Sequence, residues 1–188
     1  MNWEAEVLFW IRDNLTCGFM DWLMSTVSLL CTADIIWFVL AAVLIYRKDT
    51  RKVGTILLLA LIISIVICNG ILKPTVARIR PYDEFGVSLI VPASSEFSFP
   101  SGHTTGVTVV TAVLLKYFRK WGYLMSVFAV MVMFSRMYLF MHYPTDILGG
   151  IAVGIISVIL AHAIMAYMER KKEVRGDGMQ RISDEEGT

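Results

Sequence analysis

Apolar residues occur along this chain in runs that are long enough to cross a lipid bilayer as helices. Four such runs lie at about residues 53–72, 103–118, 121–141 and 146–168. Each approaches the roughly 20 residues that a helix needs to span the hydrocarbon layer. A further apolar stretch, residues 21–46, is interrupted by Thr32 and Asp34, and fits either one tilted helix or a short helix followed by a span. The pattern predicts an all-α, polytopic membrane bundle with five to six transmembrane helices.

The two ends of the chain differ from these runs. Residues 3–15 mix tryptophan and aliphatic residues with charged ones, which predicts an amphipathic helix at the membrane interface. The polar stretch 169–188 contains glycine and many charges, and this composition predicts a disordered cytoplasmic tail. We therefore expect residues 1–168 to form a single membrane-embedded domain. The acidic N-terminus predicts no cleavable signal peptide, so the first span should direct targeting.

Composition agrees with a membrane protein and excludes two other classes. Of the 188 residues, 56% are hydrophobic, and the mean hydropathy is +0.64. The formal net charge of only +1 gives no indication of a nucleic-acid partner. Cys17, Cys31 and Cys68 are too widely spaced for a disulfide framework or a zinc site, and we expect them to be small core residues.

The positive charges assign the two faces of the bundle. Short connections make successive helices alternate in direction, so residues 73–102 and the turn near 142 share one face. The opposite face carries most of the basic residues, namely Arg47, Lys48, Arg51, Lys52, Lys116, Arg119, Lys120, Arg170, Lys171, Lys172, Arg175 and Arg181. Because positive residues concentrate in cytoplasmic loops, this basic face should be cytoplasmic in the plasma membrane. The other face then points outward.

Three polar stretches that are distant in sequence meet on the outward face, at residues 73–81, 100–103 and 135–146. They bring Lys73, Arg80 and Arg136 to membrane depth, where charged side chains need an anionic partner. The acidic residues available to neutralise one or two of them are Asp83, Glu84 and Glu96. The remaining positive charge favours a phosphoryl group, whose oxygens match guanidinium and ammonium donors.

The sequence PSGH, residues 100–103, is suited to bind such an anion. Ser101 can cap the helix that follows, and Gly102 lets the backbone approach a ligand closely. His103 lies at the same end of the helix and can deliver a proton to a leaving oxygen. Taken alone, the motif favours a simpler interpretation, a capped helix that carries a surface histidine.

His142 and Asp146 supply a second reactive pair. Pro144 favours the first turn of a helix, so the last span should begin near Tyr143, with Asp146 in its first turn. A carboxylate that holds one imidazole nitrogen leaves the other free to attack phosphorus. The alternative is a helix-capping aspartate beside an interfacial histidine.

A metal site is the competing use of His103, His142 and Asp146. We disfavour it because three neighbouring cations would repel a divalent ion, and we expect neither metal nor cofactor. His162, in the middle of the last span, is assigned to helix packing or a structural hydrogen bond.

The three stretches read K-x6-RP, PSGH and SR-x5-H-x3-D, and in this combination the chain resembles the type 2 phosphatidic acid phosphatase family, also called lipid phosphate phosphatases. Every specified position is present, namely Lys73, Arg80, Pro81, Pro100, Ser101, Gly102, His103, Ser135, Arg136, His142 and Asp146. Family members commonly have six spans, one more than the five crossings counted here. This difference concerns the N-terminal 30 residues.

The resemblance implies a metal-independent phosphatase that works through a phosphohistidine. In that scheme His142 attacks, Asp146 orients it, and His103 protonates the departing oxygen before water hydrolyses the intermediate. The phosphoryl oxygens are held by Lys73, Arg80, Ser101, Gly102 and Arg136. Soluble vanadium haloperoxidases share the signature but are large water-soluble enzymes. A lipid-phosphate binding or transport protein without turnover is the alternative of a different class.

The expected partner is a phosphorylated lipid in the outer leaflet of the bilayer. Undecaprenyl pyrophosphate fits this side, and phosphatidic acid, phosphatidylglycerol phosphate and lysolipid phosphates are further candidates. The linker 82–99 either covers the headgroup or is an ordinary connecting loop. The pairs Gly102 with Gly106 and Gly150 with Gly154 indicate close helix packing inside one monomer, with dimerisation as the alternative. The sequence leaves the oligomeric state open.

Overall fold

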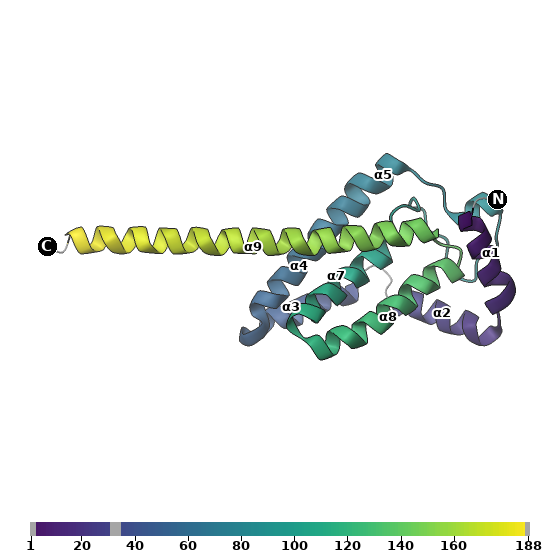
Figure 1. The fold of residues 1–188 in the computed structure, drawn as a ribbon, viewed down its shortest axis with the longest axis horizontal. Coiled ribbons are helices and arrows are strands. Elements are labelled where there is room, and N and C mark those ends of the chain that lie inside the picture. Colours follow the sequence, from purple (N-terminus) through teal and green to yellow (C-terminus); the bar gives the residue numbers. More distant parts are fainter. Residues whose placement is uncertain (1–2, 31–34, 187–188) are drawn as a thin grey trace.

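A computed structural model describes the backbone of residues 3–30 and 35–186, and the side chains of residues 3–30 and 35–172. Within these ranges the chain is helical and contains no strand, which confirms the predicted all-α class (Figure 1). The elements are α1 (Trp3–Leu15), α2 (Gly18–Leu30), α3 (Ile35–Tyr46), η2 (Lys48–Thr50), α4 (Arg51–Ile65), η3 (Val66–Leu72), α5 (Lys73–Val76), α6 (Pro81–Phe85), α7 (Gly102–Tyr117), α8 (Arg119–Tyr138) and α9 (Pro144–Glu186).

Helix α7 is the centre of the bundle. It packs against α8, α9 and α4, and α3 packs against α4 (Figure 1). Buried aliphatic residues fill the space between these helices, among them Leu57, Val107, Val110, Val132 and Ala161. Many large apolar side chains on the outer helix surfaces stay exposed, as expected of helices that face lipid.

When spans are counted by helix length and hydropathy, the structure has fewer membrane crossings than the sequence predicts. Two helical stretches in the described chain, Lys48–Phe85 and Pro144–Lys172, are long and apolar enough to cross a bilayer. The pair α2 and α3, bent by 48°, gives a third if it counts as one span. Helix α7 is short for a span, with 16 residues, and α8 has Arg119 and Lys120 at its start and Arg136 in its last turn, which lower its hydropathy. The interruption at Thr32 and Asp34 lies outside the described residues.

Two of the expected boundaries coincide with the observed ones. Helix α1 covers the predicted stretch 3–15, and α9 begins at Pro144, next to the predicted start. In the structure α9 continues as a helix to Glu186 and projects beyond the other helices, whereas the sequence predicts disorder after Met168 (Figure 1). The division into a domain and a tail stays a prediction.

The cysteine prediction holds for one residue and is wrong for another. Cys68 is buried, but Cys17 is exposed, because it lies in the short turn between α1 and α2 and not inside a helix. Cys31 lies outside the described residues.

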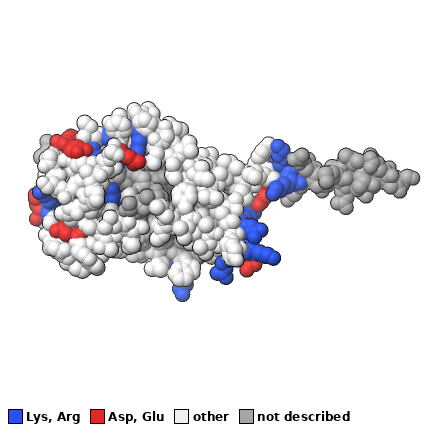
Figure 2. Space-filling model, turned by 180° about the vertical axis from the view of Figure 1, so that it is seen from behind, with Lys and Arg blue, Asp and Glu red and all other residues white. Residues whose placement is uncertain are grey.

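Charged side chains gather at the two ends of the molecule. Figure 2 shows basic side chains where α9 leaves the bundle, acidic and basic ones together at the opposite end, and an uncharged band between them. At the basic end Lys52 forms an ion pair with Glu169 at 2.8 Å. An uncharged band between two charged ends is the surface expected of a protein embedded in a bilayer.

Glycines let α9 approach α7 at the level where α7 begins. A Cβ atom on Gly150 would lie 2.8 Å from the Ser101 carbonyl oxygen and 2.9 Å from Thr104 Cβ. On Gly154, one turn later, it would lie 2.8 Å from Thr108 Cβ. This pair therefore packs inside the monomer, as predicted.

We expect Gly150→Ala to destabilise the protein, because the added methyl group must push the start of α7 away from α9. Overpacking of this kind costs about 1–3 kcal/mol. Thermal unfolding in detergent checks this, with Gly18→Ala as the control because a Cβ atom there meets nothing within 4 Å. Equal melting temperatures for the two variants would contradict the close contact between α7 and α9.

Candidate active site

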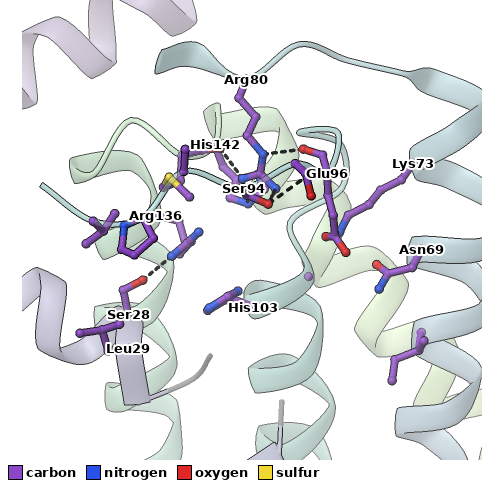
Figure 3. A pocket seen from close by; sticks show the side chains of 17 residues that line it. Ser28, Leu29, Asn69, Lys73, Arg80, Ser94, Glu96, His103, Arg136 and His142 are labelled. Atoms are coloured by element: carbon purple, nitrogen blue, oxygen red, sulfur yellow. Dashed lines mark hydrogen bonds and ion pairs between the residues drawn. The ribbon is translucent and has the colours of Figure 1, made fainter. Parts of the chain in front are cut away.

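A cavity of about 520 Å³ opens at the end of the bundle where α7 and α9 begin. Figure 3 shows Lys73 and Asn69 entering it from one side, Arg136 and Ser28 from the other, and His103 between them. Residues from all three predicted stretches line the cavity, namely Lys73, Arg80, Gly102, His103, Arg136 and His142. The structure therefore brings these six together in one place.

Lys73 reaches the cavity from the end of a π-helix. The segment η3, Val66–Leu72, adopts this wider helix directly before Lys73. Single π-helical turns are frequent at functional sites because they shift side chains out of the α-helical register. Lys73 is 6% exposed, and its ammonium group forms an ion pair with Glu96.

Arg80 is held in place by the linker it faces. Its Nε donates to the Glu96 carbonyl at 2.7 Å, and its NH2 group donates to Ser94 Oγ at 3.2 Å. Its NH1 group donates to the Met141 carbonyl at 3.1 Å and lies 3.3 Å from His142 Nε2. The guanidinium is thus fixed beside the imidazole, in the position expected of a group that holds a phosphoryl oxygen.

Arg136 approaches from the opposite wall. It lies in the last turn of α8, is 4% exposed, and donates a hydrogen bond to Ser28 Oγ on α2 (Figure 3). Its backbone also shapes the site, because the Arg136 carbonyl accepts from the His142 amide at 3.2 Å. Arg136 therefore supplies a positive charge to the cavity and also holds the loop that contains His142.

The PSGH stretch forms the predicted helix start. Ser101 is the N-cap of α7, with its Oγ accepting from the Thr104 amide at 3.4 Å. Ser101 is fully buried and does not line the cavity, so its contact with phosphate stays a prediction. Gly102 and His103 do line it, and a Cβ atom on Gly102 would lie 3.9 Å from Lys73 Nζ. The first turn of α7 thus faces the ammonium group.

The surroundings of His142 define its tautomer. Its Nε2 faces an arginine NH1 group, which can only donate, so Nε2 must carry the lone pair. Its proton is then on Nδ1, which lies 3.6 Å from Asp146 Oδ2. The carboxylate lies behind one nitrogen and the lone pair is on the other, as predicted, but this lone pair faces Arg80. The 3.6 Å between Nδ1 and the carboxylate is longer than a hydrogen bond.

The protonation state of His142 suits a nucleophile. The residue is 2% exposed, and burial lowers its pKa from the usual 6.5 to about 3. The Asp146 carboxylate raises the pKa of His142, while the positive charges of Arg80 and Arg136 lower it further. Because the folded-state pKa lies below 6.5, the imidazole is neutral at neutral pH and protonates only as the pH falls far below that value.

Asp146 is saturated by donors that sequence reasoning did not identify. Its Oδ2 accepts from Ser98 Oγ at 2.5 Å and from the Tyr143 amide at 2.8 Å. Its Oδ1 accepts from Arg78 NH1 at 2.8 Å. Asp146 is fully buried and does not line the cavity, so it acts on His142 from behind.

Other cavity residues were also missed. Asn69, Ser94 and Ser28 line the cavity, and Glu96 was named only as a possible counter-ion. Asn69 had a detectable signal, since it is an amide within the apolar run 65–72. The serines had none, because their position depends on how the linker and α2 fold back.

His162 has the structural contacts assigned to it from the sequence. Its Nδ1 lies 2.8 Å from the Val158 carbonyl, and its Nε2 lies 3.2 Å from Tyr117 Oη. The carbonyl can only accept, so Nδ1 carries the proton and Nε2 accepts from the tyrosine.

The cavity contains three basic side chains, one carboxylate and two imidazoles. This charge balance attracts an anion with several oxygens and disfavours a divalent cation. Among the described residues there is no group of three or more His, Cys, Asp or Glu that could hold a metal ion.

Fold and cavity together define a helical membrane protein with a cationic internal site. A family model of the PAP2 superfamily matches residues 53–170, which is more than half of the chain. The chain belongs to this superfamily, and the family that the three motifs resemble is thereby confirmed.

Similar proteins are known in bacteria and archaea. An undecaprenyl-diphosphatase of Sulfolobus acidocaldarius is 32% identical over 123 residues, which cover 64% of this chain and 59% of that protein. The undecaprenyl-diphosphatase BcrC of Bacillus subtilis is 33% identical over 110 residues, 58% of this chain and 54% of that one. The chain thus spans between half and two thirds of the length of these relatives.

A solved structure has the same fold over most of the chain. The PAP2-type phosphatidylglycerolphosphate phosphatase of Bacillus subtilis superposes with a TM-score of 0.69 at 25% identity. The match covers 87% of this chain and 85% of that one. It therefore includes helices outside the region matched by the family model.

Proposed function

We propose that this chain is an integral membrane phosphatase that removes a phosphoryl group from a lipid phosphate or diphosphate. The observation that carries the proposal is the cavity of about 520 Å³, in which three distant stretches place three cations and two imidazoles. Binding of a phosphate requires only the cations. A neutral, oriented imidazole is needed in addition when a histidine forms a covalent bond to phosphorus.

In the first half of the reaction His142 Nε2 attacks phosphorus. A bond forms between Nε2 and phosphorus, and the bond from phosphorus to the lipid oxygen breaks. Lys73, Arg80 and Arg136 stabilise the negative charge on the phosphoryl oxygens, as positioned donors do in phosphoryl transfer. Asp146, behind Nδ1, stabilises the positive charge that develops on the imidazole.

His103 serves the leaving group and then the water. Burial and the neighbouring positive charges lower the pKa of the His103 imidazole, so its protonated form depends on the bound phosphate, whose negative charge offsets those cations. The protonated His103 then donates to the departing lipid oxygen and is left neutral. In the second half it takes a proton from water, whose oxygen attacks phosphorus and breaks the bond to Nε2. Inorganic phosphate leaves, and both histidines return to their starting states.

The similar proteins indicate which lipids to test first. Relatives are named undecaprenyl-diphosphatases, and the solved structure is of a phosphatidylglycerolphosphate phosphatase. Undecaprenyl pyrophosphate is therefore the first substrate to test, followed by phosphatidylglycerol phosphate and phosphatidic acid. All three present a phosphate at the membrane surface on an apolar tail.

The site should face the extracytoplasmic side of the plasma membrane. The support is the distribution of charge, since basic residues gather at the end of the bundle opposite the cavity (Figure 2). Loops that carry many lysine and arginine residues stay on the cytoplasmic side of the membrane. A count of five to six crossings belongs to the same proposal.

We expect the purified protein to release phosphate from at least one of these lipids in detergent micelles, at an unchanged rate in EDTA. The reason is that basic side chains, and not a metal ion, neutralise the phosphoryl charge. Phosphate release measured with and without EDTA checks this.

Binding of all the lipids without phosphate release would instead favour the alternative of a binding or transport protein. Activity that EDTA removes and a divalent cation restores would contradict the metal-independent mechanism.

A further inference from the structure

The N-terminal helix α1 lies outside the region matched by the family model, yet it contacts the site. Glu4, in its first turn, is only 7% exposed. A buried carboxylate near the membrane surface is costly unless it is paired. Its partners therefore indicate what the helix does.

Glu4 pairs with the arginine that holds Asp146. Arg78 NH2 lies 2.6 Å from Glu4 Oε2, and Arg78 NH1 lies 2.8 Å from Asp146 Oδ1. One guanidinium thus bridges two carboxylates that are 142 positions apart in the sequence. Arg78 also stacks 3.8 Å over the Tyr143 ring, which fixes its plane.

The second oxygen of Glu4 binds the start of α9. Glu4 Oε1 accepts from Thr145 Oγ1 at 2.6 Å and from the Thr145 amide at 3.2 Å. Burial raises the pKa of Glu4, but the hydrogen bonds from Thr145 and Arg78 outweigh it and leave the pKa below its usual value. Glu4 is therefore ionised, and it ties α1 to the turn that carries Asp146.

We propose that Glu4 is a positioning residue for the reaction, acting through Arg78 on the Asp146 carboxylate behind His142. This proposal rests on the phosphatase function proposed above. Glu4, Arg78 and Asp146 form a group of two negative charges and one positive charge, with a net charge of minus one. Without Glu4, Arg78 would neutralise Asp146 completely.

The net charge matters when the bond to phosphorus forms. The imidazole of His142 then becomes positive, and a net negative group behind Nδ1 lowers the energy of that state. Glu4 lies away from the cavity and contacts no residue that holds the phosphoryl oxygens. Its charge should therefore affect the rate of phosphoryl transfer and leave lipid binding unchanged.

The test compares Glu4→Gln with wild type in a single turnover, with enzyme in excess over radiolabelled lipid. Glutamine keeps the size of the side chain and an acceptor for Thr145. It removes the negative charge and replaces the oxygen that accepts from Arg78 by an amide donor. We expect the rate constant for phosphoenzyme formation to fall about tenfold, the lower end of the loss seen when a group behind a metal-bound histidine is removed. The amplitude and KM should stay the same.

The control is Glu6→Gln, which removes an exposed carboxylate from the same helix. A wild-type rate constant in Glu4→Gln, or a lower amplitude with an unchanged rate constant, would overturn the proposal. A wild type that forms no phosphoenzyme would instead refute the proposed function. If Glu4→Gln does not fold, Glu4→Ala replaces it, because alanine removes the same negative charge without placing an amide donor against Arg78, and a wild-type rate constant there would equally overturn the proposal.

Discussion

Replacing His142 by alanine is expected to lower kcat by at least about a thousandfold, because it removes the imidazole proposed to form the covalent bond to phosphorus. Lipid binding should persist, since Lys73, Arg80 and Arg136 remain. The measurement is phosphate release at saturating lipid, together with KM or direct binding of the lipid.

The matched control is His162→Ala, which removes an imidazole from α9 away from the cavity. It should keep the wild-type KM and most of the activity, although loss of the contact with Tyr117 can lower stability. Full activity in His142→Ala would remove this residue from the role of nucleophile. Equal losses in the two variants would point to folding and not to chemistry.

Replacing His103 by alanine is expected to have the second-largest effect, a loss of about a hundredfold to ten-thousandfold in kcat on a lipid substrate. The lipid oxygen leaves as a basic alkoxide or phosphate unless it receives a proton. Nitrophenolate is a far weaker base and needs little protonation. Transfer from nitrophenyl phosphate to the enzyme should therefore be much less affected, and comparison of the two substrates checks this.

The variant should also release phosphate slowly from the phosphoenzyme, because the same imidazole activates water. A burst of nitrophenolate followed by a slow steady state is the expected result. An equal loss of transfer rate for both substrates would contradict the role of His103 as the acid and leave it a binding residue.

The sequence predicts the convergence of the site well because alternating spans assign each polar stretch to a face. Lys73 and His103 lie on separate helices and His142 lies in the turn between α8 and α9. From the sequence, only the parity of the crossings places them together. Local signals predict two helix starts, at Ser101 through its capping hydroxyl and at Pro144 through its fixed backbone angle. These arguments need no knowledge of side-chain packing.

The second layer of the site could not be predicted in this way. Contacts such as Glu4 with Arg78, or Ser98 with Asp146, depend on how an N-terminal helix and a linker fold over the bundle. No periodicity in the sequence encodes those distances. The π-helix before Lys73 could not be predicted either, because VICNGIL has no residue that favours it over an α-helix.

The most direct test of the whole account is to find the phosphoryl group on the protein. Enzyme mixed with radiolabelled lipid phosphate is quenched in alkali within one turnover, digested, and analysed by mass spectrometry. We predict one phosphoryl group on His142, absent from His142→Ala. Wild-type turnover without a labelled protein, or with the label on another residue, would contradict the mechanism.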